Sequence, residues 1–213
     1  KIFFPAYCVF CLKEKNLYKS FIILALPVFG VNMLMSMNDL IDTYFIGQMP
    51  NSVAAQAGMS ISWPLINILM AFNIGLAVAG VAIISQLLGA GNKKAAQKYS
   101  GMLILFSTIL GIFINLILFL ITPTVIGWMG ATGEVYSSSV IYVQTRSFEL
   151  VFTFIFASFQ SIRQARGDTI TPVALSALGI LVNVILNGVF IQGLGMGVFG
   201  AALATVISQV IKV

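Results

Sequence analysis

The sequence predicts an all-α membrane protein with six transmembrane helices, and three observations lead to this fold class. Of the 213 residues, 59% are hydrophobic and only 8% are charged, whereas soluble domains carry about 25% charged residues. Stretches without any charge cover residues 43–92, 99–133 and 169–211. Each stretch has room for at least one spanning helix of about 20 residues. This composition excludes a soluble globule, and the many large apolar side chains exclude an extended disordered chain.

Turn and loop residues divide the chain into the six expected spans, because clusters of Gly, Pro, Asn and Ser interrupt helices. The dividing segments are residues 47–52, 89–92, 122–123, 166–168 and 193–197. The resulting spans are Ser20–Gly47, Val53–Leu88, Ala95–Ile121, Val135–Arg163, Thr171–Ile191 and Val198–Val213.

The basic residues support this count and predict the orientation, because Lys and Arg stay on the cytoplasmic side. With the N-terminus inside, ten of the 11 basic residues fall in cytoplasmic segments, and the remaining one, Arg146, falls inside the fourth span. The ten are Lys1, Lys13, Lys15, Lys19, Lys93, Lys94, Lys98, Arg163, Arg166 and Lys212. Splitting Val53–Leu88 into two helices would move Lys93 and Lys94 outside, so this stretch is predicted as one long span. Both termini are expected to be cytoplasmic, and the net charge of +5 indicates orientation rather than nucleic-acid binding.

Residues 1–16 are interpreted as an N-terminal cytoplasmic segment, with a reading-frame artefact as the alternative. The apolar run Ile2–Leu12 is too short to span a bilayer, and it lacks a signal-peptide cleavage site. Cys8 and Cys11 form a C-x-x-C pair, but the chain has no second pair and no His, so no role is assigned to them. The chain begins without Met and stops within the sixth span, so we expect it to be a piece of a longer protein.

The residue types argue against an enzyme. Without His, the chain cannot form Ser-His hydrolase or His-ligated zinc sites. An intramembrane aspartyl protease needs aspartates from different helices that share a proton, whereas Asp39 and Asp42 lie in the same span. No phosphate-binding G-x-x-x-x-G-K-[ST] loop is present. We therefore expect no cofactor and no metal beyond a coupling Na⁺.

Polar residues within the spans indicate the candidate site, because such groups are costly in a bilayer and mark ion or substrate pathways. Asp42, Asn187 and Thr205 come from three spans but lie at a similar depth, roughly 8–11 Å below the outer loops, with Asn183 about one turn deeper. Oxygen ligands of this kind suit a hard cation such as Na⁺. The alternatives are that Asp42 carries a proton, or that the amides and hydroxyl only hydrogen-bond helices together.

Three further charged residues are candidates for a cavity or coupling role. Asp39 lies three residues before Asp42, at a neighbouring position of the same face. It either shares the role of Asp42 or lies near the outer interface. Arg146 and Glu149, three apart in the fourth span, predict an internal ion pair whose expected role is structural.

Four sets of motifs resemble the multidrug and toxic compound extrusion (MATE) transporters, in the order in which that family has them. They are Ala25-Leu26-Pro27 with Asp42–Gly47 in the first helix, Ser85–Lys93 after the second, Arg163–Thr169 with Pro172 between the fourth and fifth, and Gly200–Thr205 in the sixth. The resemblance covers residues 17–213.

The resemblance implies a secondary antiporter that exports small organic, often cationic, compounds in exchange for H⁺ or Na⁺ across the cell membrane. Family members have twelve helices in two six-helix lobes, and residues 17–213 match the N-terminal lobe, so the C-terminal lobe is missing. The family's cation site in this lobe uses the positions that match Asp42, Asn183, Asn187 and Thr205. Some members carry Asp where this chain has Asn187, which leaves Asp42 as the main titrating candidate. We expect membrane lipid around the lobe, and we expect no nucleic-acid partner.

Two other functions stay open. A lipid-linked oligosaccharide flippase of the same wider superfamily would carry phosphates and need basic residues in its cavity, whereas only Arg146 lies within a span. A receptor or scaffold without transport would use the polar residues only to hold helices together. Ion-gradient dependence of dye efflux distinguishes this last function from an antiporter.

Overall fold

The computed structural model describes residues 26, 29–30, 33, 36–38, 40–48 and 52–213. The first expected span is therefore described in part, with continuous helix over residues 40–47. The segment 1–16 with Cys8 and Cys11, and the candidate Asp39, lie outside the described residues.

The remaining elements are helices that correspond to the other five expected spans. They are α3 (Ser52–Gly89), α4 (Lys93–Trp128), α5 (Gly133–Ala165), α6 (Ile170–Asn187), the π-helix η1 (Gly188–Gly193) and α7 (Gly197–Lys212). Within the described residues, α3, α4, α5 and α6 with η1 are long and apolar enough to cross a membrane, and α7 is a shorter apolar helix. The predicted all-α membrane fold is confirmed, and α3 is one helix, as predicted, although it contains Pro64.

The predicted break at residues 122–123 is wrong, because α4 continues through Pro123 to Trp128. Pro123 has no N–H to donate to the carbonyl of Phe119, which normally breaks a helix. Here the Gln144 side chain of α5 donates to that carbonyl at 3.1 Å. A neighbouring helix thus replaces the lost bond, as is common for prolines in membrane helices. The turn comes instead at Gly130, whose φ of +84° suits glycine.

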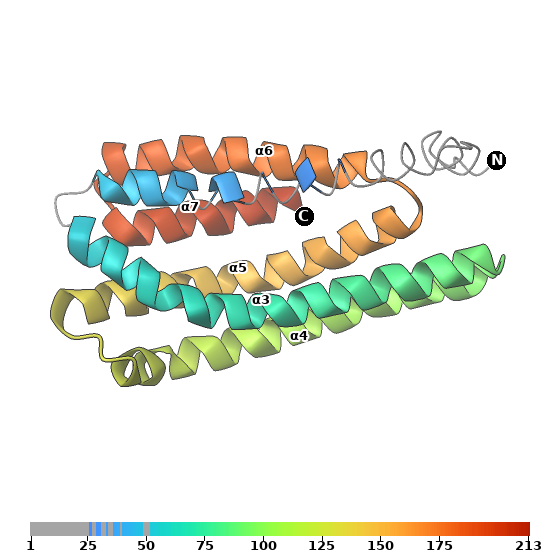
Figure 1. Ribbon diagram of the computed structural model, residues 1–213, viewed down its shortest axis with the longest axis horizontal. Helices are drawn as coiled ribbons and strands as arrows, with labels where there is room; N and C mark the ends of the chain where they lie inside the picture. The colour runs from blue at the N-terminus through green and yellow to red at the C-terminus, as the bar shows by residue number, and fades with distance from the viewer. Residues whose placement is uncertain (1–25, 27–28, 31–32, 34–35, 39, 49–51) are drawn as a thin grey trace.

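The connections between helices gather at two ends of the molecule. Figure 1 shows the α3–α4 and α5–α6 turns at one end and the α4–α5 and η1–α7 connections at the other. Lys93, Lys94 and Arg166 lie at the first of these ends. Lys212, expected in a cytoplasmic segment, is in the last turn of α7, with its stem packed against Gly179 of α6.

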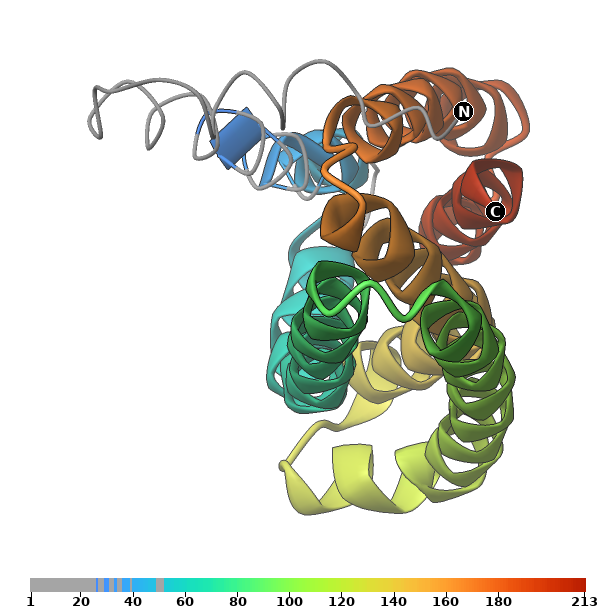
Figure 2. The same cartoon turned by 90° about the vertical axis from the view of Figure 1, so that its right-hand side faces the viewer.

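Helix α5 is the central element of the bundle. It packs against α3, α4 and α7, and α6 packs against α7. Figure 2 shows α3 and α4 on one side of α5, and α6, α7 and the helix of residues 40–47 on the other. Small residues allow this close packing. Ser139 donates to the Gly58 carbonyl at 3.2 Å, Ser161 donates to the Ala77 carbonyl at 3.0 Å, and the Ser107 and Ser158 hydroxyls share a hydrogen bond.

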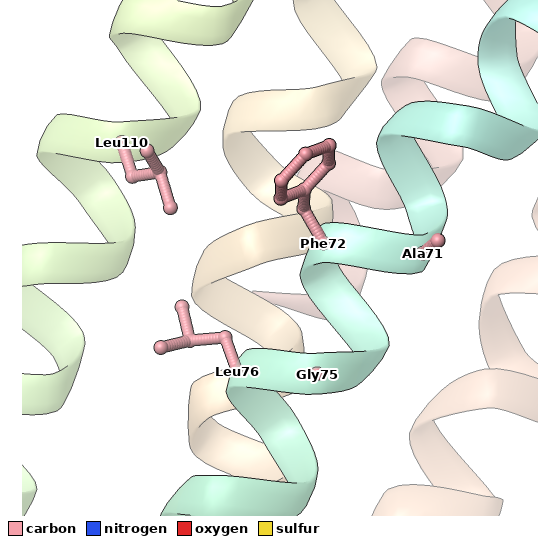
Figure 3. Close-up of a pocket in the computed structure, with 5 residues that line it drawn as sticks. All are labelled: Ala71, Phe72, Gly75, Leu76 and Leu110. Atoms are coloured by element: carbon pink, nitrogen blue, oxygen red, sulfur yellow. The ribbon is translucent and has the colours of Figure 1, made fainter.

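A groove of about 490 Å³ lies between α3 and α4 (Figure 3). It is lined by Ala71, Phe72, Gly75, Leu76 and Leu110. None of these side chains carries a polar atom, so the groove cannot coordinate an ion and is separate from the polar residues that the sequence singles out.

The Asp168 carboxylate, in the loop before α6, holds the start of that helix. It accepts the Thr171 backbone N–H at 3.1 Å and the Thr171 hydroxyl at 2.7 Å, and it pairs with Arg163. Partial burial acts against the charge, but the bonds from Thr171 and the charge of Arg163 outweigh it, so the pKa of Asp168 is lowered from its ordinary value of 3.8.

We expect Asp168→Ala to lower the free energy of unfolding by about 1 kcal/mol at neutral pH, the usual effect of losing a helix-capping side chain. Because the folded-state pKa is lowered, the stabilisation is complete above the ordinary pKa and is lost as the pH falls through the lowered value. Thermal unfolding of the purified protein at neutral and acidic pH checks both statements. Asp168→Asn, which keeps an acceptor for Thr171, should lose less, and equal stability of all three proteins at neutral pH would contradict the assignment.

Candidate cation site

Four polar side chains from three helices meet in the interior. The Asn187 Nδ2 of α6 donates to Asp42 Oδ1 at 2.7 Å, and the Thr205 hydroxyl of α7 lies 3.2 Å from Asp42 Oδ2. Asn183 completes the set, because it accepts from Asn187 at 3.0 Å and donates to Thr205 at 3.3 Å. Each of the four residues is at most 2% exposed. The structure thus brings together Asp42, Asn183, Asn187 and Thr205.

The local structure of α6 and α7 places their polar side chains on the faces that point toward the cluster. Asn183 and Asn187 are four residues apart, so both lie on one face of α6. Asn187 is the last residue of α6, directly before the π-helix η1, and such π-turns occur frequently at functional sites. Thr205 lies on the buried side of α7, next to Ala204 and one turn after Ala201, both of which are buried as well.

Two acceptor oxygens at the cluster compete for one proton, and a third has no donor among the described residues. The single proton of the Thr205 hydroxyl serves either Asp42 or the Ala201 carbonyl at 3.1 Å, but not both at once. Asn187 Oδ1 is buried and has no hydrogen-bond partner among the described residues. An unpaired buried acceptor costs about 1–3 kcal/mol. A bound cation or water would remove that cost.

The charge of the cluster comes from Asp42 alone. Neither of the two ion pairs that the described residues form includes Asp42. A carboxylate buried without a paired cation is unfavourable, so it calls for a proton or a metal cation. Within the described part of the chain, no group of three or more His, Cys, Asp or Glu residues could hold a metal ion. One carboxylate with amide and hydroxyl oxygens fits a hard, monovalent cation.

The predicted ion pair between Arg146 and Glu149 is present on α5, with the Arg146 Nε 2.8 Å from Glu149 Oε2. Two residues that sequence reasoning missed complete it. Arg146 donates to the Tyr142 hydroxyl at 2.7 Å, and Gln209 of α7 donates to Glu149 Oε1 at 3.3 Å. The signal for Tyr142 was its position four residues before Arg146, and that for Gln209 was its position four residues after Thr205.

Known proteins are similar to this chain in sequence and in fold. The MatE family model matches residues 27–189. The multidrug export protein MepA of Staphylococcus haemolyticus is 31% identical over 205 residues, which cover 95% of this chain and 45% of the relative. The probable multidrug resistance protein NorM of Thermotoga maritima is 31% identical over 201 residues, covering 90% and 42% respectively.

A solved structure agrees with the sequence comparisons. The crystal structure of MATE in the bent conformation superposes with a TM-score of 0.85 at 25% identity, covering 91% of this chain and 43% of that one. The chain therefore spans less than half the length of each of these proteins, which is consistent with one lobe of a two-lobed transporter. Because the family model covers most of the chain and the fold agrees, this protein belongs to the MatE family of multidrug and toxic compound extrusion transporters and is a multi-pass membrane protein.

Proposed function

We propose that the protein containing this chain is a secondary antiporter that exports small organic compounds and binds its coupling cation, H⁺ or Na⁺, at Asp42. The observation that carries this proposal is a buried carboxylate, Asp42, which has no ion-pair partner among the described residues and lies beside Asn187 Oδ1, an acceptor that no described residue pairs with. The relatives named as multidrug export and multidrug resistance proteins support efflux as the activity. The proposed substrates are amphipathic, cationic compounds. The proposed partners are a second six-helix lobe and membrane lipid.

The Asn187 amide offers a simple means of responding to the cation. In the structure its Nδ2 donates to Asp42, and this bond suits a deprotonated Asp42 with no cation bound to it. Rotation of the amide by half a turn would present Oδ1 instead, so that Asp42 and Asn187 would both direct oxygens at a bound Na⁺. A protonated Asp42 could likewise donate to Oδ1. The cluster would therefore hydrogen-bond differently in its empty and loaded states.

This difference is what coupling requires. A cation shifts the balance between outward-open and inward-open states only as far as its affinities for the two states differ. Asp42, Asn187 and Thr205 come from three separate helices, so loading the site would alter contacts between the helices and favour one arrangement of the lobe. In transporters built from repeats, such movements give alternating access. The substrate flux is then driven by the cation gradient.

Dye efflux from proteoliposomes tests the proposal. The protein encoded by the complete gene is reconstituted with ethidium inside, and a Na⁺ gradient, a pH gradient or a choline gradient of equal ionic strength is imposed. We expect efflux to accelerate with the Na⁺ or the pH gradient and not with choline. An efflux rate that is the same with and without the Na⁺ and pH gradients would contradict antiport. The absence of any efflux would favour a receptor or scaffold.

A further inference from the structure

Among the described residues, two positive side chains (Arg146 and Lys212) and two negative ones (Asp42 and Glu149) lie in or beside the core around the candidate site. Asp42 interacts electrostatically with Arg146, which attracts it, and more weakly with Glu149, which repels it. Lys212, at the end of α7, lies within electrostatic range of Asp42 and Glu149. Among the described residues, Tyr142 also interacts electrostatically with Asp42, and the α6 residues in the cluster, Asn183 and Asn187, are neutral.

The ion pair is held firmly next to the site. Glu149 and Tyr142 both bind the guanidinium of Arg146. The Tyr142 ring belongs to the same buried apolar cluster as Ile46, one turn after Asp42, and Ala201, one turn before Thr205. Gln209, which donates to Glu149, follows Thr205 by one turn of α7. Arg146 is 8% exposed and Glu149 3% exposed, so neither charge is well screened by water.

We propose that the Arg146–Glu149 pair sets the affinity of Asp42 for the coupling cation, with Arg146 weakening cation binding and Glu149 limiting that effect. This inference rests on the proposed function, because it assumes that Asp42 binds the cation. The pair thereby acts as a positioning and tuning element, and neither residue touches the cation.

The physical reason is competition for one carboxylate. A coupling cation and the Arg146 guanidinium both interact favourably with Asp42, and in a poorly polarisable interior such interactions extend over several ångströms. Glu149 binds the guanidinium directly and opposes its field at Asp42. Transport needs a site that binds its ion well enough to load and weakly enough to release. A partly compensated positive charge beside Asp42 supplies that balance.

The charge variants have opposite expected effects. Glu149→Gln leaves Arg146 uncompensated and should weaken cation binding by about tenfold, whereas Arg146→Gln should strengthen it by about tenfold. The double variant R146Q/E149Q leaves neither member of this pair as an uncompensated charge, and it should bind the cation more tightly than the wild type but less tightly than Arg146→Gln, because Arg146 acts on Asp42 more strongly than Glu149 does. The affinity is read from thermal unfolding midpoints of the purified full-length protein titrated with NaCl against choline chloride, and with pH in the absence of Na⁺.

The second ion pair of the described residues, between Arg163 and Asp168, is the matched control. It joins the last turn of α5 to the loop before α6, so Asp168→Asn should change the thermal stability without changing the cation concentration that gives half of the cation-dependent stabilisation. If Glu149→Gln and Arg146→Gln lower the thermal stability but leave unchanged the Na⁺ or H⁺ concentration that gives half of the cation-dependent stabilisation, the pair is only structural and the inference is wrong. If the wild type shows no cation effect that Asp42→Asn removes, the proposed function fails and this inference fails with it. The double variant decides the matter if a single variant does not fold.

Discussion

Asp42→Asn is expected to reduce cation-coupled dye efflux to the background rate while the protein still folds and inserts. The substitution keeps nearly the same shape, and its carbonyl oxygen can still accept the bond from Asn187 Nδ2. It removes the negative charge that would bind a cation or a proton at the cluster. Folding should not suffer, because Asp42 forms no ion pair with any described residue, and burying such a carboxylate costs more free energy than burying an amide.

Efflux is measured in proteoliposomes under the Na⁺ or pH gradient that drives the wild type, and folding by fluorescence-detected size exclusion of the same preparations. Asp168→Asn is the control, because it neutralises an aspartate outside the cluster and should keep its efflux. An Asp42→Asn protein that pumps at the wild-type rate under the same gradient would show that Asp42 does not couple transport.

The second large effect concerns the contact between α4 and α5. A Cβ atom at Gly111 would lie 3.1 Å from the Val151 Cα and 3.3 Å from the Phe154 Cβ. Gly111→Leu therefore forces two helix backbones apart, and overpacking of this kind costs about 1–3 kcal/mol or more. We expect a clear fall in the thermal unfolding midpoint and a lower yield of folded protein.

Gly101, on the same helix, is the matched control. A Cβ there would meet nothing within 4 Å, and leucine favours helix over glycine by about 0.5–1 kcal/mol. Gly101→Leu should therefore leave the unfolding midpoint unchanged or raise it. Equal midpoints for the two variants would mean that α4 and α5 do not pack as closely as the structure has them.

The spans and the candidate site were largely predictable from the sequence because the bilayer imposes simple rules. Charges are excluded from the hydrocarbon, so charge-free stretches predicted the helices, and the placement of Lys93 and Lys94 predicted one long helix at α3. The depth along each helix follows from the constant rise per residue. That rise was enough to place Asp42, Asn187 and Thr205 at a common level before any coordinates.

Only the tertiary structure determined which side chains of different helices are in contact. Depth along a helix says nothing of its rotation or of its distance from a neighbour, and these depend on how small residues pack. Gln144 reaches the Phe119 carbonyl only because α4 and α5 pack closely, and this contact lets α4 run through Pro123. The same packing places Gln209 against Glu149 and leaves Asn187 Oδ1 without a hydrogen-bond partner in the part of the chain that the structure describes. The chain's pattern thus determined which residues share a level in the membrane, and the packing of helices determined which of them touch.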